Sequence, residues 1–79
     1  MRTLTVYVRP DCHLCDEALA AIEEMRDELD PFELVTVDID SDDRLLAAFL
    51  ERIPVVQIDG TTVSELEFER AAVLDTLRR

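Results

Sequence analysis

A strand pattern that stops at a proline, with two cysteines directly after it, constrains the fold of this chain most. Residues 3–8 alternate polar and apolar side chains, which is the two-residue period of a β-strand. Pro10 ends that strand, and Asp11 is expected to cap a helix over residues 12–29. Cys12 and Cys15 therefore fall in the first turn of a helix that follows a strand.

The rest of the chain continues this alternation of strands and helices. Further strands are predicted over residues 32–39, 54–58 and 61–63, the last two joined by the hairpin dipeptide Asp59-Gly60. Asp40 and Ser41 are expected to open a second helix. Its buried side is predicted to carry Leu45, Leu46, Phe49 and Leu50.

The stretch from Ser64 to Glu67 matches a capping box, so a last helix is predicted to begin there, with Leu66, Val73 and Leu77 on one face. The predicted order is thus β-α-β-α-β-β-α in a single domain, residues 1–79. The first two strands flank a helix and should be parallel, whereas the last two should form an antiparallel hairpin. We therefore expect an α/β fold in which three helices cover a four-stranded mixed sheet.

Charge and hydropathy limit the classes of partner. The chain has 19 acidic and 8 basic residues, a formal net charge of −11. A nucleic-acid-binding protein needs a basic face to neutralise phosphates, so that class is disfavoured. No apolar run is long enough to cross a bilayer, and no signal-peptide pattern precedes the cysteines. We expect a cytoplasmic monomer with neither a nucleic-acid nor a membrane partner.

Two cysteines could form a structural cross-link or a reactive pair. A bridge between Cys12 and Cys15 closes a loop of about four residues, which contributes only ~2 kcal/mol in the chain-entropy model. A cross-link that held the fold together would close a longer loop, and permanent disulfides are rare in the cytoplasm. The pair is therefore interpreted as reactive.

The helix start makes this chemistry possible. Unpaired backbone N–H groups and the positive end of the helix dipole stabilise an anion at Cys12, so its thiolate is expected to be the nucleophile. Cys15 lies one turn further in, beside the apolar stripe, and is expected to resolve the mixed disulfide.

The neighbours of the pair leave two questions open. His13 either stabilises the Cys12 thiolate when protonated or is an exposed spacer, while Arg9 is the nearest positive charge against several acidic neighbours. A single Cys-x-x-Cys is also half of a tetrahedral zinc site. The chain has no second pair to complete it, so we expect no metal site within one chain. A zinc or iron–sulfur carrier would use the pair at a dimer interface.

The segment Tyr7-Val8-Arg9-Pro10-Asp11-Cys12-His13-Leu14-Cys15, together with Ile53-Pro54 and Asp59-Gly60, resembles glutaredoxins and the wider thioredoxin fold. The likeness extends over essentially the whole chain, and the short group with a Cys-x-Leu-Cys motif is the most similar. In that family the proline matching Pro54 is cis and faces the nucleophilic cysteine. The backbone of the residue matching Ile53 pairs with the bound peptide or glutathione.

The resemblance implies a dithiol oxidoreductase that reduces or exchanges disulfides of proteins or low-molecular-weight thiols. Cys12 and Cys15 would be catalytic, and Arg9, His13, Leu14, Ile53 and Pro54 would bind substrate or tune the pair. No bound cofactor is implied; the reductant would be glutathione or a thioredoxin reductase. The family's Gly-Gly pair before the last helix, which holds glutathione, is absent from Val63-Ser64-Glu65-Leu66-Glu67.

Overall fold

The computed structural model describes residues 1–79 and has the predicted order of elements, with two short 3-10 helices added. The elements are β1 (Arg2–Val8), α1 (His13–Met25), η1 (Arg26–Glu28), β2 (Phe32–Asp38), η2 (Ile39–Ser41), α2 (Asp43–Phe49), β3 (Val55–Ile58), β4 (Thr61–Glu65) and α3 (Arg70–Leu77). The helix predicted over residues 12–29 therefore ends at Met25 and tightens into η1. No helix is both long and apolar enough to cross a membrane.

The sheet has the strand order β2-β1-β3-β4. β1 runs parallel to β2 and antiparallel to β3, and β3 and β4 form the predicted antiparallel hairpin. Leu4 of β1 is level with Leu34 on one side and with Ile58 on the other. Since side chains alternate along a strand, this register places apolar side chains of three strands on one face.

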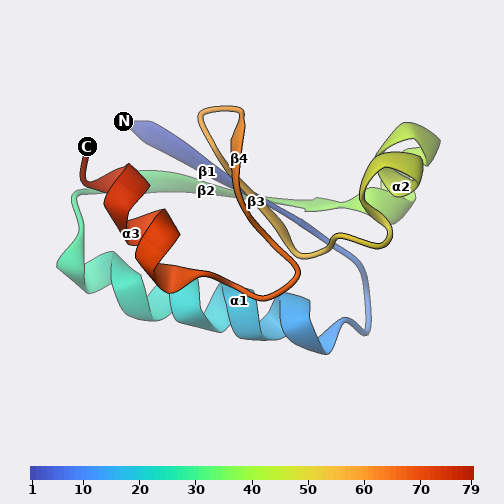
Figure 1. Cartoon of the computed structure of the whole chain (residues 1–79), viewed down its shortest axis with the longest axis horizontal. Helices are drawn as coiled ribbons and strands as arrows, with labels where there is room; N and C mark the ends of the chain where they lie inside the picture. The colour runs from blue at the N-terminus through green and yellow to red at the C-terminus, as the bar shows by residue number, and fades with distance from the viewer.

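That face is covered by α1 and α3, which lie on the same side of the sheet (Figure 1). The fully buried Ile22 and Met25 of α1 pack against side chains from the strands and from α3. The cluster is completed by Leu4, Val6, Phe32, Val56, Ile58 and Val73. The two helices therefore share one apolar core with the sheet.

The second helix is less buried than the sequence predicts. It begins at Asp43, after η2, and Asp42 caps it by accepting a hydrogen bond from the Arg44 backbone N–H. None of its residues is buried, and Leu50, which follows it, is 44% exposed. The predicted buried side is only half-buried at Leu45, Leu46 and Phe49, because α2 lies at the end of the sheet (Figure 1). Phe49 contacts the Tyr7 ring there, with centroids 4.7 Å apart.

The prediction of a capping box and a helix start at Ser64 was also wrong. Ser64 and Glu65 belong to β4, and α3 begins only at Arg70. The buried Ser64 hydroxyl donates to the Glu67 carbonyl and accepts from the Glu69 N–H, so it holds the loop before α3 and caps no helix. Leu66, predicted on the helix face, is 49% exposed in this loop.

Leu66 adopts a left-handed backbone conformation, with φ at 61°. A left-handed conformation destabilises a residue that has a β-carbon by about 1–2 kcal/mol relative to glycine. Glycine loses more backbone entropy on folding, which offsets about 0.5–1 kcal/mol of this difference. We expect Leu66→Gly to raise the free energy of unfolding by up to about 1 kcal/mol in urea denaturation. A lower free energy of unfolding would show that the leucine side chain stabilises the loop.

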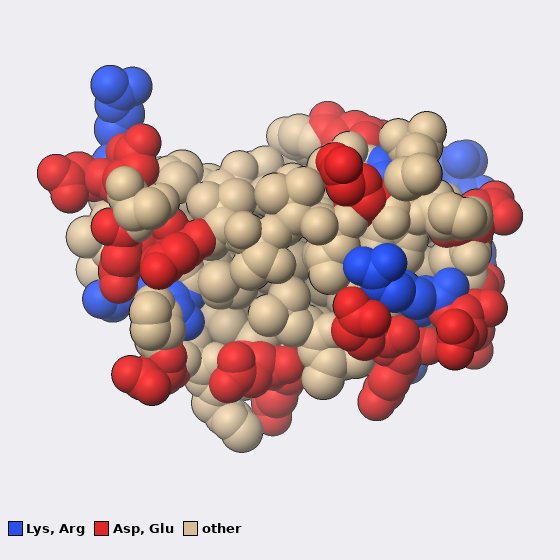
Figure 2. Space-filling view, turned by 180° about the vertical axis from the view of Figure 1, so that it is seen from behind, with Lys and Arg blue, Asp and Glu red and all other residues tan.

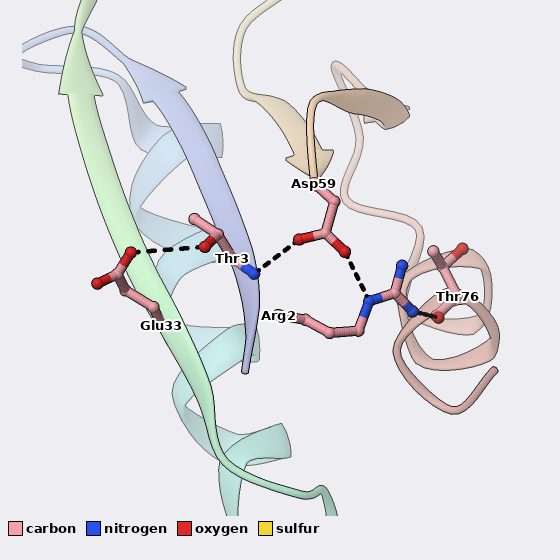
Figure 3. Close-up of polar contacts among 5 residues, drawn as sticks. All are labelled: Arg2, Thr3, Glu33, Asp59 and Thr76. Carbon is pink, nitrogen blue, oxygen red and sulfur yellow. Dashed lines mark hydrogen bonds and ion pairs between the residues drawn. The ribbon is translucent and has the colours of Figure 1, made fainter.

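At the opposite end of the sheet, Asp59 ties the β3–β4 hairpin to the N-terminus (Figure 3). Its carboxylate accepts from the Thr3 backbone N–H at 3.0 Å and from Arg2 Nε at 2.8 Å, and Arg2 also donates to the Thr76 carbonyl of α3. These bonds, the Thr3 N–H first and Arg2 second, hold the pKa of Asp59 below its ordinary value. The Asp59-Gly60 turn, with positive φ at both residues, therefore anchors three elements.

The charge on Asp59 should make part of the stability depend on pH. A carboxylate whose pKa is lowered by folding stabilises the native state above its unfolded pKa of about 4, and loses this contribution as pH falls through the folded value. Asp59→Asn keeps an acceptor and removes the charge. We expect it to lower the free energy of unfolding at pH 7, with a difference from the wild type that shrinks at pH 3. A difference that is unchanged at pH 3 would exclude the charge as its cause.

Candidate active site

The loop from β1 to α1 places the two cysteines. Asp11 was expected to cap the helix, but it lies in the loop with φ at 59°, and Cys12 is the N-cap. The Cys12 Sγ accepts a hydrogen bond from the Cys15 backbone N–H at 3.1 Å. The sulfur therefore takes the place that a capping oxygen usually has, against one of the unpaired N–H groups of the helix start.

The two sulfurs are joined in a disulfide whose Cα atoms lie 5.2 Å apart. They differ in access to solvent: Cys12 is partly exposed, whereas Cys15 is 1% exposed and packs within the core. Only the first of the two can be reached by a large partner. An attack from outside is therefore directed to Cys12, and Cys15 is placed to react only with its neighbour.

The helix start favours a thiolate at Cys12. When the disulfide is reduced, the Cys15 N–H and the positive end of the 13-residue helix stabilise a negative charge on the Cys12 sulfur. The only acidic side chain in the first turn is Asp16, which acts against this charge.

Neither of the two predicted tuning cations has a cysteine as its partner. His13 is 87% exposed and lies 3.2 Å from the carboxylate of Glu17, one turn further along α1. Arg9 binds Asp40 of η2 at 2.9 Å. Each of these two side chains therefore lies against a carboxylate and not against a cysteine sulfur.

Ile53 and Pro54 lie just before β3, at the end of the sheet where α1 begins and opposite the two chain termini (Figure 1). Their peptide bond is cis, Pro54 is buried and Ile53 is half-buried. The preceding residue is anchored firmly, because the Arg52 carbonyl accepts from the Leu66 N–H at 3.0 Å. The segment before β3 is thus held against the end of β4, at the same end of the fold as the disulfide.

Residues 3–78 match the family model described as Glutaredoxin-like domain (DUF836). The chain belongs to this family. The predicted family and the predicted thioredoxin-like α/β fold are both confirmed, the fold by solved structures as well.

Several solved structures are similar to this chain, among them the following three. The NMR structure of protein Ne2328 from Nitrosomonas europaea has a TM-score of 0.85 at 27% identity, covering 96% of this chain and 91% of that one. The X-ray structure of XcR50 from X. campestris has a TM-score of 0.76 at 34% identity, covering 95% of both chains. A malarial protein, 16% identical with a TM-score of 0.67, covers 99% of this chain and 93% of its own and shows the fold alone. No curated protein matches significantly.

This glutaredoxin-like domain has two features that the sequence did not predict at the end of the fold that carries the cysteines, called the active-site end below. Arg52 binds both carboxylate oxygens of Glu65 across the segment before β3, which raises the pKa of Arg52 and lowers that of Glu65. Phe68 lines a groove that reaches Leu14, the residue between the cysteines in the sequence. The false helix start at Ser64 hid it, since the loop that carries Phe68 was expected to be helical.

The two cysteines are the only thiols in the chain, and no group of three or more His, Cys, Asp or Glu side chains is arranged to hold a metal ion. A zinc or iron–sulfur site built on Cys12 and Cys15 would therefore take its remaining ligands from a second copy of the chain.

Proposed function

We propose that this protein is a dithiol thiol–disulfide oxidoreductase. One observation carries the proposal: the two cysteines of a Cys-x-x-Cys pair differ in access, with Cys12 partly exposed at the helix start and Cys15 buried behind it. A structural cross-link has no need of this asymmetry. A two-step exchange needs one sulfur that meets the partner and a second that meets only the first.

The proposed reaction starts from the reduced pair. The Cys12 thiolate attacks one sulfur of a partner disulfide, which forms a mixed disulfide and releases the other partner sulfur as a thiolate. The Cys15 sulfur, deprotonated as it reacts, then attacks Cys12 and releases the second partner thiolate. The partner gains two electrons and takes up two protons, and the protein is left with the Cys12–Cys15 disulfide.

The surrounding residues support a partner in extended conformation. Ile53 is half-buried beside the buried Pro54, and we propose that its backbone pairs with the partner chain, as the family resemblance implies. Leu14, 41% exposed between the cysteines, offers an apolar contact next to the reacting sulfur. His13 is proposed to modulate the pair through its charge, because it lies in the first turn of α1.

The electron donor defines the class of oxidoreductase. The proposed donors are glutathione, which reduces the disulfide through a mixed disulfide, and a thioredoxin reductase, which supplies two electrons from a nicotinamide cofactor. Oxidised protein should be reduced by one of these two systems within the time of a turnover assay, measured by the alkylation of free thiols. A disulfide that neither donor opens would contradict a cycling oxidoreductase.

A further inference from the structure

A groove with a volume of about 380 Å³ lies between α1 and the loop that joins β4 to α3. Its apolar surface comes from Leu14, Ala21 and Phe68, and its charged residues are Glu17, Glu67 and Arg70. Leu14 stands between the two cysteines in the sequence, so the groove begins within two residues of Cys12.

The only arginine in the groove is already paired. Arg70 binds the carboxylate of Glu24 at 2.7 Å, so the charges of these two side chains cancel. Glu67 has no ion pair, and Glu17 has only the exposed His13 imidazole at 3.2 Å as a partner, which carries a charge only when protonated. The groove therefore presents two carboxylates beside an apolar surface.

At the end of the fold that carries the cysteines, too, two arginines are paired and some carboxylates are not. Arg9 is paired with Asp40, and Arg52 with Glu65, which leaves neither cation free for an anionic partner. Asp11 and Asp16, next to the cysteines, take part in no ion pair. At the end where α2 lies, on the left in Figure 2, carboxylates crowd around the few arginines. The electrostatic potential near Cys12 thus favours a cation.

We infer that this groove binds a lysine or arginine side chain of a polypeptide partner, one or two residues from the cysteine that reacts with Cys12. The inference rests on the proposed oxidoreductase function and names its substrate class. A long basic side chain packs its apolar stem on Leu14 and Phe68 while its charged head reaches Glu17 or Glu67. Glutathione carries two carboxylates and one ammonium group, so it is a poorer match for this surface.

The test compares two disulfide-bonded peptides that differ only beside the cysteine, one with lysine and one with glutamate. The wild type should reduce the lysine peptide with a kcat/KM on the order of tenfold higher, mainly through KM, because exposed charge pairs contribute a few tenths to 1 kcal/mol each. The ratio should fall towards one at 0.5 M salt, where the charges are screened.

A double variant and a matched control assign the effect to the groove. Glu17→Gln combined with Glu67→Gln should reduce the lysine preference to less than about threefold. Glu28→Gln, an exposed carboxylate in η1 at the other end of α1, should leave the preference as in the wild type. A preference that survives the double variant, or that Glu28→Gln removes equally, would overturn the inference.

The outcomes also separate this inference from the proposed function. Equal reduction of both peptides by the wild type would overturn the basic-substrate inference and leave the oxidoreductase standing. Reduction of neither peptide by dithiol protein would overturn the oxidoreductase, and the substrate class with it.

Discussion

Replacing Cys12 by serine should abolish disulfide reduction, whereas replacing Cys15 by serine should stop the reaction at a covalent intermediate. The reason is the unequal access of the two sulfurs: Cys12 is partly exposed, and Cys15 is 1% exposed. Without Cys12 no sulfur can be reached from outside. Without Cys15 the first attack still occurs, but no neighbouring thiol releases the partner.

Mass spectrometry of each variant, incubated with a peptide disulfide, measures this difference directly. We expect a stoichiometric adduct on Cys15→Ser, with the partner mapped to Cys12, and no adduct on Cys12→Ser. Glu28→Gln, in η1 at the far end of α1, serves as a control that keeps both thiols. An equal adduct on the two cysteine variants, or turnover by Cys12→Ser at the wild-type rate, would refute the assigned order of attack.

A second large effect is expected in the core. Ile22 of α1 is fully buried in the cluster that joins α1, α3 and the sheet. Ile22→Ala removes buried methyl groups and leaves a cavity, which typically costs about 2–5 kcal/mol. A domain of this size has a total stability of only ~4–12 kcal/mol, so the variant should lose a large part of it.

Urea denaturation of Ile22→Ala and of a matched control measures this cost. Leu50→Ala removes the same number of carbon atoms from a residue that is 44% exposed. It should lower the free energy of unfolding by about 1 kcal/mol or less. Similar losses in the two variants would mean that the apolar cluster between α1 and the sheet does not dominate stability.

The parts of the fold that follow from local patterns could be predicted from the sequence. β1 and α1 bury the apolar side chains that their spacing predicts. The Asp59-Gly60 turn has the positive φ angles that this dipeptide favours. The helix between β1 and β2 and the tight turn between β3 and β4 made the parallel pair and the antiparallel hairpin predictable. The antiparallel pairing of β3 with β1 was not predicted.

The failures occurred where a local signal competed with tertiary contacts. Ser64 and Glu67 have the spacing of a capping box, yet Ser64 lies opposite Val56 in the sheet and its hydroxyl binds the following loop. At the other helix start, Asp11 is a good capping residue, but the chain turns there and Cys12 takes the cap. At neither position does the side chain that was expected to cap the helix accept a hydrogen bond from the first N–H groups of that helix.

The charge pairing of the active-site end could not be predicted from the sequence at all. Arg9 meets Asp40, and Arg70 meets Glu24, across separations of 31 and 46 residues. A sequence shows that arginines are present but not that carboxylates already neutralise them. The inferred preference for a cationic partner therefore depends on the structure and could not be drawn from the sequence.

The most direct test of a dithiol oxidoreductase is an equilibrium titration of the cysteine pair in thiol–disulfide buffers, read out by alkylation and mass. We expect Cys12 and Cys15 to convert together between dithiol and disulfide in one reversible two-electron transition, whose midpoint falls within the range set by glutathione and dithiothreitol buffers. A pair that stays oxidised in every buffer, or thiols that never form the internal disulfide, would contradict this function.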